Sequence, residues 1–322
     1  MQTLLIGRGE LTASCLALGC MRIARVPEAE SETLIRTALD CGINFFDHAD
    51  IYDGGEAESR FGGFLRKNPS VRDNILIQSK CAIVPGPTHL LGSDCSKEHI
   101  LSSVEGSLSR LGTDHLDTLL LHMPDPLVEP EEVAEAFDAL QRSGKVRFFG
   151  VSNHKPMFID LLRKCVNQRL IIDQVQCGVA NPVIVDSTAA FHLRDEFRAD
   201  RNGDVMTYAR LHDMTIQAWS PFQMGLYGGV YLGSDRFPEL NQVTSRLARE
   251  KGVSPSAIAI AWLLRMPARI QPLIGTTNAA RLRDICTAAE VSLSRLEWYE
   301  MYRASIVDQN KLLPSGAGAK VK

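Results

Sequence analysis

Four residues with reactive side chains follow apolar segments of the sequence. Asp47 and Lys80 each close an apolar run, and His122 comes directly after three leucines. Tyr52 lies five residues beyond Asp47. A carboxylate, a phenol, an ammonium and an imidazole are the groups needed to move a proton and to hold a polar substrate oxygen. Each has an ordinary structural alternative, namely a helix cap, a half-buried aromatic, a surface lysine and a core histidine. Their shared place at the ends of apolar runs favours a catalytic role.

Eight short β-rich segments alternate with longer helical patterns. They are Leu16–Gly19, Ile43–Ala49, Ile75–Lys80, Leu116–Met123, Val146–Asn153, Ile171–Cys177, Met214–Pro221 and Ile270–Thr276. This alternation predicts a parallel sheet, and eight units favour a closed α/β barrel of the (β/α)8 type. A doubly wound open sheet is the alternative, but no strand is followed by the G-x-G-x-x-G phosphate turn. Active sites of such barrels lie at the carboxyl ends of the strands, where the four reactive residues stand.

Helix start and stop residues support the same organisation. They are Ser96 and Gly112 around one helix, Pro130 and Gly144 around a second, Ser254-Pro255 before a third, and the capping-box pair Ser294 and Glu297 before a last.

A single barrel domain is expected over residues 1–322, because no linker long enough to separate two domains is present. Residues 1–13 are expected to form a hairpin that closes one end of the barrel, and 306–322 a tail. Long active-site loops are expected at 84–91, 180–203 and 225–238.

Composition excludes several classes of protein. The chain has 322 residues, of which 45% are hydrophobic, so a packed globular fold is expected. The net charge of -3 argues against a nucleic-acid partner. No apolar run reaches the roughly 20 residues of a membrane span and no export signal opens the chain, so a cytoplasmic protein without membrane association is expected. The eight cysteines show neither a disulfide framework nor a zinc-binding spacing, and no metal site is expected.

Several strings of the sequence resemble the aldo-keto reductase family over roughly residues 14–300. In chain order they are Phe45–Tyr52, Ile77–Lys80, Leu119–His122, Gly144–Asn153, Asp173–Gln176, Ala218–Pro221 and Ile274–Arg281. Within the family, the residues of these segments most resemble those of the bacterial YdhF-like predicted oxidoreductases.

The resemblance implies reduction of an aldehyde or ketone to an alcohol by hydride transfer from NADPH. Tyr52 would then donate the proton that the developing alkoxide needs. Lys80 would stabilise the phenolate, and Asp47 would hold Lys80 in place. His122 would hydrogen-bond the substrate oxygen. His48, next to Asp47, is expected to point the other way along the strand and to serve the structure.

The resemblance also implies a set of cofactor-binding residues. They are Ser152, Asn153, Gln174, Trp219, Ser220, Gly275, Thr276, Thr277 and Arg281. Trp219 offers a face for the nicotinamide ring, and Arg281 suits the 2′-phosphate that distinguishes NADP from NAD. Gly275 stands where many members of the family carry a basic residue, which removes one support for an NADP preference.

Two other functions fit a barrel of this kind. One is an NADPH-binding regulatory or redox-sensor subunit with little turnover, as the potassium-channel β subunits of the family suggest. The other is an isomerase or lyase acting on a phosphorylated substrate, which would place anion-binding glycines after the seventh and eighth strands without an Asp, Tyr, Lys and His set. The presence of that set argues against this second function. A small carbonyl compound is the expected substrate, and no pattern in the sequence names that compound or an oligomeric state.

Overall fold

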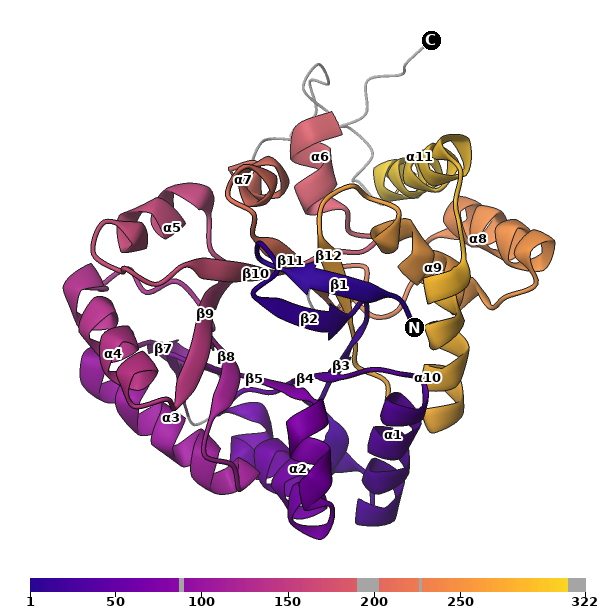
Figure 1. Ribbon diagram of the computed structural model, residues 1–322. Coiled ribbons are helices and arrows are strands. Elements are labelled where there is room, and N and C mark those ends of the chain that lie inside the picture. The colour runs from indigo at the N-terminus through magenta and orange to yellow at the C-terminus, as the bar shows by residue number, and fades with distance from the viewer. Residues whose placement is uncertain (87–89, 190–202, 226–227, 312–322) are drawn as a thin grey trace.

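The structure is a computed structural model that describes residues 1–86, 90–189, 203–225 and 228–311. Within this part of the chain eight parallel strands close into a barrel in the order β10-β11-β12-β3-β4-β5-β8-β9 (Figure 1). The strands are β3 (Ala17–Gly19), β4 (Phe45–Asp47), β5 (Leu76–Cys81), β8 (Leu116–Leu121), β9 (Val146–Ser152), β10 (Leu170–Gln176), β11 (Thr215–Trp219) and β12 (Ile270–Ile274). The predicted (β/α)8 barrel is confirmed, and each predicted segment contains or overlaps one of these strands.

Helices surround the barrel as an outer layer (Figure 1). They are α1 (Glu28–Asp40), α2 (Glu56–Lys67), α3 (Lys97–Leu111), α4 (Pro130–Arg142), α5 (Pro156–Arg163), α6 (Val183–Ala189), α7 (Val205–Leu211), α8 (Pro238–Lys251), α9 (Pro255–Leu264), α10 (Ala279–Cys286) and α11 (Arg295–Lys311).

The cap residues explain where several of these helices begin and end. The Ser96 hydroxyl accepts a hydrogen bond from the third residue of α3, and Gly112 ends that helix at a φ of +66°. Ser294 and Glu297 accept hydrogen bonds from each other's backbone N–H groups before α11. Local sequence therefore sets these boundaries, as predicted.

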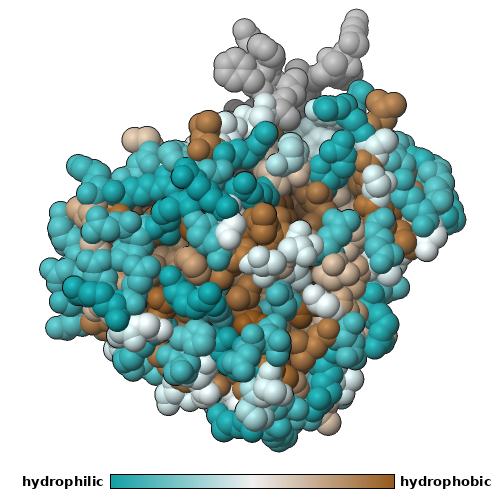
Figure 2. Space-filling view, in the orientation of Figure 1, coloured by the Kyte–Doolittle hydropathy of each residue, from teal (hydrophilic) through white to brown (hydrophobic). Residues whose placement is uncertain are grey.

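An N-terminal hairpin of β1 (Thr3–Ile6) and β2 (Leu11–Ser14) lies across one end of the barrel (Figure 1). Its Ile6 and Leu11 side chains are buried in one cluster with Phe45 and Leu273 from the barrel strands. The hairpin therefore seals the amino-terminal end of the barrel with an apolar layer, as the sequence suggested. Figure 2, drawn from the same side, shows hydrophilic side chains over the outer helices and hydrophobic ones gathered toward the middle of this face.

The structure adds details that local patterns did not predict. The loop expected at 84–91 contains parts of a second hairpin, β6 (Ile83–Pro85) with β7 (Leu90–Ser93). Helices α6 and α7 occupy parts of the expected loop 180–203 and the stretch after it. Helix α11 continues to Lys311, past residue 306, where a tail was expected to begin. Residues 87–89, 190–202, 226–227 and 312–322 of the expected loops and tail lie outside the described residues.

Other features concern the whole described part of the chain. All eight cysteines are free thiols, and five of them are buried. No described helix combines the length and the apolar character that crossing a membrane requires. The described residues contain no group of three or more His, Cys, Asp or Glu side chains arranged to hold a metal ion.

Candidate active site

Neighbouring strands bring the four reactive residues, here called the tetrad, to the carboxyl end of the barrel. Asp47 ends β4, Lys80 lies near the end of β5, and His122 directly follows β8. Tyr52 begins a short 3-10 helix after β4, and the backbone N–H of Asp50 donates to the Lys80 carbonyl over 3.1 Å. This hydrogen bond holds the loop that carries Tyr52 against β5.

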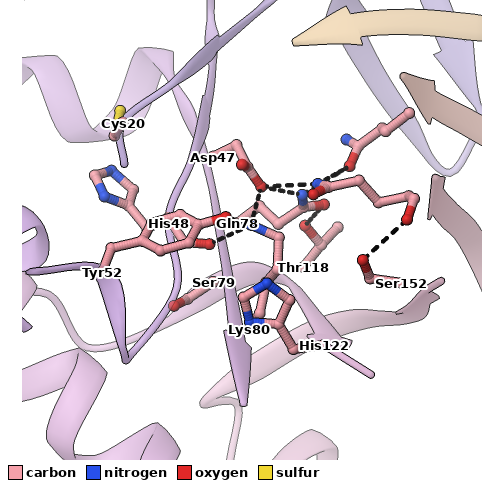
Figure 3. Close-up of polar contacts among 12 residues, drawn as sticks. Cys20, Asp47, His48, Tyr52, Gln78, Ser79, Lys80, Thr118, His122 and Ser152 are labelled. Atoms are coloured by element: carbon pink, nitrogen blue, oxygen red, sulfur yellow. Dashed lines mark hydrogen bonds and ion pairs between the residues drawn. The ribbon is translucent and has the colours of Figure 1, made fainter. Parts of the chain in front are cut away.

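The Lys80 ammonium is the centre of the tetrad (Figure 3). Its nitrogen lies 2.7 Å from Asp47 Oδ1, 2.9 Å from the Tyr52 hydroxyl and 2.7 Å from the His48 carbonyl oxygen. The Lys80 side chain is wholly buried. An ammonium has three N–H groups, so these three acceptors satisfy it completely. A buried charge requires such partners, and here they fix its position.

Burial and charge act in opposite directions on these groups. Burial lowers the pKa of Lys80, but the Asp47 carboxylate and the Tyr52 hydroxyl outweigh it, so that the pKa is raised. Burial raises the pKa of Tyr52; the Lys80 charge lowers it without cancelling that effect. Lys80 is therefore a permanent cation beside a phenol that keeps its proton at neutral pH.

His122 is a neutral imidazole in this site. Burial, aided by the Lys80 charge, lowers its pKa well below the ordinary value. Its ring meets the Tyr52 ring edge-on, with centroids 5.8 Å apart. A neutral imidazole carries one N–H donor, and this is the form needed to hydrogen-bond a carbonyl oxygen.

His48 has the structural role that strand alternation predicted. It is wholly buried and packs against Phe61, with ring centroids 4.7 Å apart. Burial, with a smaller contribution from the Lys80 charge, lowers its pKa to about 3. Its side chain therefore belongs to the core, while its backbone carbonyl binds Lys80.

Four of the expected cofactor-binding residues form one hydrogen-bonded group. The Trp219 indole donates to Asn153 Oδ1 over 3.1 Å, and Asn153 Nδ2 donates to the Ser152 hydroxyl over 3.0 Å. The Ser152 hydroxyl donates to the backbone carbonyl of Gln174 over 2.9 Å. Asn153 has a φ of +62°, a left-handed conformation that Asn adopts more readily than most residues. Ser220 continues from Trp219, also at positive φ.

The remaining expected residues lie at the junction of β12 and α10. Gly275, Thr276 and Thr277 connect the two elements, and Asn278 caps the helix by accepting from the Arg281 N–H over 2.8 Å. Arg281 therefore lies in the first turn of α10. Its side chain makes no ion pair with the residues that the structure describes.

Arg22 is a residue of this region that the sequence did not indicate. Its guanidinium donates a hydrogen bond to the carbonyl oxygen of Gly275, although the two residues are 253 positions apart. A Cβ atom built at Gly275 would lie 3.7 Å from the Arg22 Nη2 atom. A cation from the loop after β3 thus lies beside Gly275, at the junction of β12 and α10.

A model of the Aldo/keto reductase family matches residues 15–305. The chain belongs to the aldo/keto reductase family. It is an oxidoreductase of that family, and the resemblance seen in the sequence is confirmed.

Individual relatives of this aldo/keto reductase agree with the family assignment. A 6-dehydroglucose reductase of Agrobacterium fabrum is 38% identical over 306 residues, covering 92% of this chain and 96% of the relative. Oxidoreductase YdhF of Escherichia coli is 35% identical over 279 residues, covering 85% and 87% of the two chains. The crystal structure of the thermostable aldo-keto reductase Tm1743 in complex with the inhibitor epalrestat is similar, with a TM-score of 0.75 and 25% identity. That comparison covers 94% of this chain and 100% of the other.

The barrel interior also holds polar residues that sequence reasoning missed. Gln78 donates to Asp47 Oδ1 over 2.6 Å and to Gln217 Oε1 over 2.7 Å. Both glutamines lie in apolar strand segments, two residues before Lys80 and Trp219 respectively. Because side chains two apart on a strand share a face, that spacing is the signal that could have revealed them.

Proposed function

We propose that this aldo/keto reductase reduces an aldehyde or ketone to an alcohol with NADPH, with Tyr52 as the proton donor. The observation that carries the proposal is the Lys80 ammonium, which is hydrogen-bonded to the Tyr52 hydroxyl and to Asp47 at once. A phenol gives up its proton most readily where a fixed cation stabilises the phenolate.

Each side chain of the tetrad has a separate role in the proposed reduction. The Tyr52 hydroxyl transfers its proton to the carbonyl oxygen as that oxygen gains negative charge. Lys80 faces the phenolate that remains, and Asp47 keeps Lys80 in position. The neutral His122 ring donates a hydrogen bond to the same carbonyl oxygen and so orients the substrate.

The residues at the strand ends fit NADPH as the cofactor, which supplies the hydride when it is bound. Trp219, with Ser152, Asn153, Gln174 and Ser220 around it, offers an aromatic face and amide and hydroxyl groups to a nicotinamide ring.

The phosphate end of the cofactor fits a second group of residues. Arg281, with Gly275, Thr276 and Thr277, offers the first turn of α10 and a guanidinium that makes no ion pair with the described residues to the adenosine 2′-phosphate. Arg22 adds a second cation beside Gly275. These two cations support NADPH over NADH.

An initial-rate screen with NADPH and with NADH tests the proposal. The panel contains aldehydes, ketones and 6-dehydroglucose, the compound for which the relative from Agrobacterium fabrum is named. We expect turnover of at least one carbonyl compound, faster with NADPH. Tight NADPH binding with no turnover across the panel would instead favour the redox-sensor function.

A further inference from the structure

Four glutamine side chains form a polar layer inside the barrel, directly beneath the tetrad. The glutamine layer consists of Gln78 on β5, Gln174 on β10, Gln217 on β11 and Gln271 on β12. Strand pairing puts Gln174 opposite Gln217 and Gln217 opposite Gln271. Asp47 is in turn opposite Gln78. None of the four is more than 3% exposed. Branched apolar residues usually fill such a barrel interior, so buried amides here require an explanation.

The layer is a continuous chain of hydrogen bonds. Gln271 Nε2 donates to the Ser14 carbonyl over 2.8 Å, and Gln217 Nε2 donates to Gln271 Oε1 over 2.9 Å. Gln217 Oε1 accepts from Gln78 Nε2 over 2.7 Å and from Gln174 Nε2 over 2.9 Å.

This chain of hydrogen bonds ends at the tetrad. Gln78 donates to Asp47 Oδ1 over 2.6 Å, beside the ion pair that Lys80 makes with the same atom (Figure 3). Gln174 donates to the same oxygen over 3.0 Å. Among the described residues, no buried nitrogen or oxygen atom of the four amides lacks a partner.

The groups at the two ends of this hydrogen-bond chain, the Ser14 carbonyl and the Asp47 carboxylate, fix the direction of every amide. A backbone carbonyl and a carboxylate both only accept, so Gln271 and Gln78 must turn their NH2 groups toward opposite ends. Thr118 Oγ1 also donates to Gln78 Oε1 over 2.9 Å, which sets the same orientation. All the dipoles near Asp47 therefore present N–H groups to its carboxylate, and linked hydrogen bonds of this kind strengthen one another.

We propose that Gln78 and Gln217 are positioning residues of the active site, which hold Asp47 Oδ1 at the point where it fixes the Lys80 ammonium against Tyr52. This inference rests on the proposed function, because the tetrad is the group that they position. Gln78 acts directly on Asp47, and Gln217 acts one step away by orienting the amides of Gln78 and Gln174. Gln271 lies at the far end of the hydrogen-bond chain, where it is bound to the Ser14 carbonyl.

Substitution by methionine tests the proposal, because Met keeps the length and unbranched shape of Gln but has no amide. The variants are Gln78→Met, Gln217→Met and Gln271→Met. Gln168→Met is the matched control. It removes a hydrogen bond that a glutamine donates to a carboxylate, that of Asp138, but this bond lies outside the barrel interior. Each variant is characterised by the free energy of unfolding, the Kd for NADPH, and kcat divided by the number of NADPH-binding sites.

We expect kcat per binding site to fall in a graded order. The loss is about 10-fold or more in Gln78→Met, smaller in Gln217→Met and about 2-fold or less in Gln271→Met, because a hydrogen bond to a charged group contributes most. The pH midpoint of the rate profile should also move in Gln78→Met and stay in place in Gln168→Met. A loss of kcat that is equal in all three network variants, or that follows the loss of folding stability, would overturn the proposal. If Gln78→Met does not fold, Gln217→Met carries the same test.

Crystal structures of the variants provide a readout that needs no turnover. In Gln78→Met the Asp47 carboxylate should rotate and lose its 2.7 Å contact with Lys80, whereas Gln168→Met should keep that contact. An unchanged Asp47–Lys80 pair in Gln78→Met would overturn the positioning role even if the wild-type enzyme reduces no compound of the panel. Failure of the proposed function is seen separately, in the wild-type rate screen.

Discussion

The ammonium of Lys80 donates a hydrogen bond to the hydroxyl oxygen of Tyr52 over 2.9 Å. The same nitrogen lies 4.7 Å from the centre of the Tyr52 ring. The cation therefore faces both the oxygen and the ring, across which the negative charge of a phenolate would spread. Because Asp47 and the His48 carbonyl hold the other two N–H groups of Lys80, this arrangement exists before any substrate binds.

Replacing Tyr52 by Phe should remove most carbonyl reduction and leave NADPH binding intact. Tyr52→Phe deletes only the hydroxyl, so the ring still packs against His122. Loss of a positioned proton donor costs about 100-fold or more in rate. Initial rates give the activity, and fluorescence titration gives the Kd for NADPH. Turnover close to wild type with normal cofactor binding would refute the assignment of Tyr52 as the acid.

Replacing Lys80 by Met should affect both activity and stability. Lys80→Met leaves the buried Asp47 carboxylate without its cation, and breaking a buried ion pair in this way costs about 3 kcal/mol or more. Carbonyl reduction should fall sharply at every pH. Chemical denaturation measures the stability, and initial rates measure the activity.

The double variant Asp47→Asn with Lys80→Met is the control for this prediction. Because it removes both charges, its free energy of unfolding should recover much of the loss, while activity stays low. If Lys80→Met keeps wild-type activity with an unchanged pH profile, Lys80 is a structural residue and the proposed mechanism is wrong.

Acid should destabilise the fold through His48. Burial lowers the pKa of His48 from 6.5 to about 3. Between these two values the unfolded chain binds the proton and the folded chain does not, so stability falls as the pH falls below 6.5. At about pH 5 the loss from this one group is about 2 kcal/mol.

His48→Leu isolates this contribution from those of the other titratable groups. The difference in unfolding free energy between wild type and His48→Leu should change by about 2 kcal/mol between about pH 7 and pH 5. Leu cannot take up a proton, so the wild type should lose the greater stability on acidification. Parallel curves for the two proteins would mean that His48 is protonated in the folded state as readily as in the unfolded chain.

Cofactor choice should depend on Arg281. A charge-assisted hydrogen bond contributes roughly 1.5 to 3 kcal/mol, so Arg281→Ala should weaken NADPH binding by about 10-fold or more. NADH lacks the 2′-phosphate, and its Kd should stay nearly the same. Dissociation constants for both nucleotides at one salt concentration test this, and equal losses would show that Arg281 does not contact the phosphate.

Replacing Arg22 should also weaken NADPH binding more than NADH binding, but by less than replacing Arg281. Its guanidinium is already hydrogen-bonded to the Gly275 carbonyl, so part of its donor capacity is used. Arg22→Ala should raise the Kd for NADPH by about 3-fold and change the Kd for NADH less. Arg142→Ala is a suitable control, because Arg142 is an exposed arginine in the last turn of α4, far from the junction of β12 and α10. A larger effect in the control than in Arg22→Ala would exclude Arg22 from cofactor binding.

The sequence alone predicted the barrel, its eight strands, several helix caps and the tetrad. These features are local: a strand shows as a short β-rich run, a cap as a Ser or Gly at a helix end, and the tetrad as reactive residues after apolar runs. Asp47, Lys80 and His122 could be placed together because the carboxyl ends of all parallel strands in a barrel lie at one face.

Only the tertiary structure decided which side chains touch one another. The Gln217 amide meets Gln78, 139 positions earlier, and Arg22 meets Gly275, 253 positions later. Neither contact has a local signal, because each depends on how strands pair around the closed barrel and where the loops then lead. The protonation states of His48 and His122 likewise follow from burial, which the surrounding packing sets and the residue type does not.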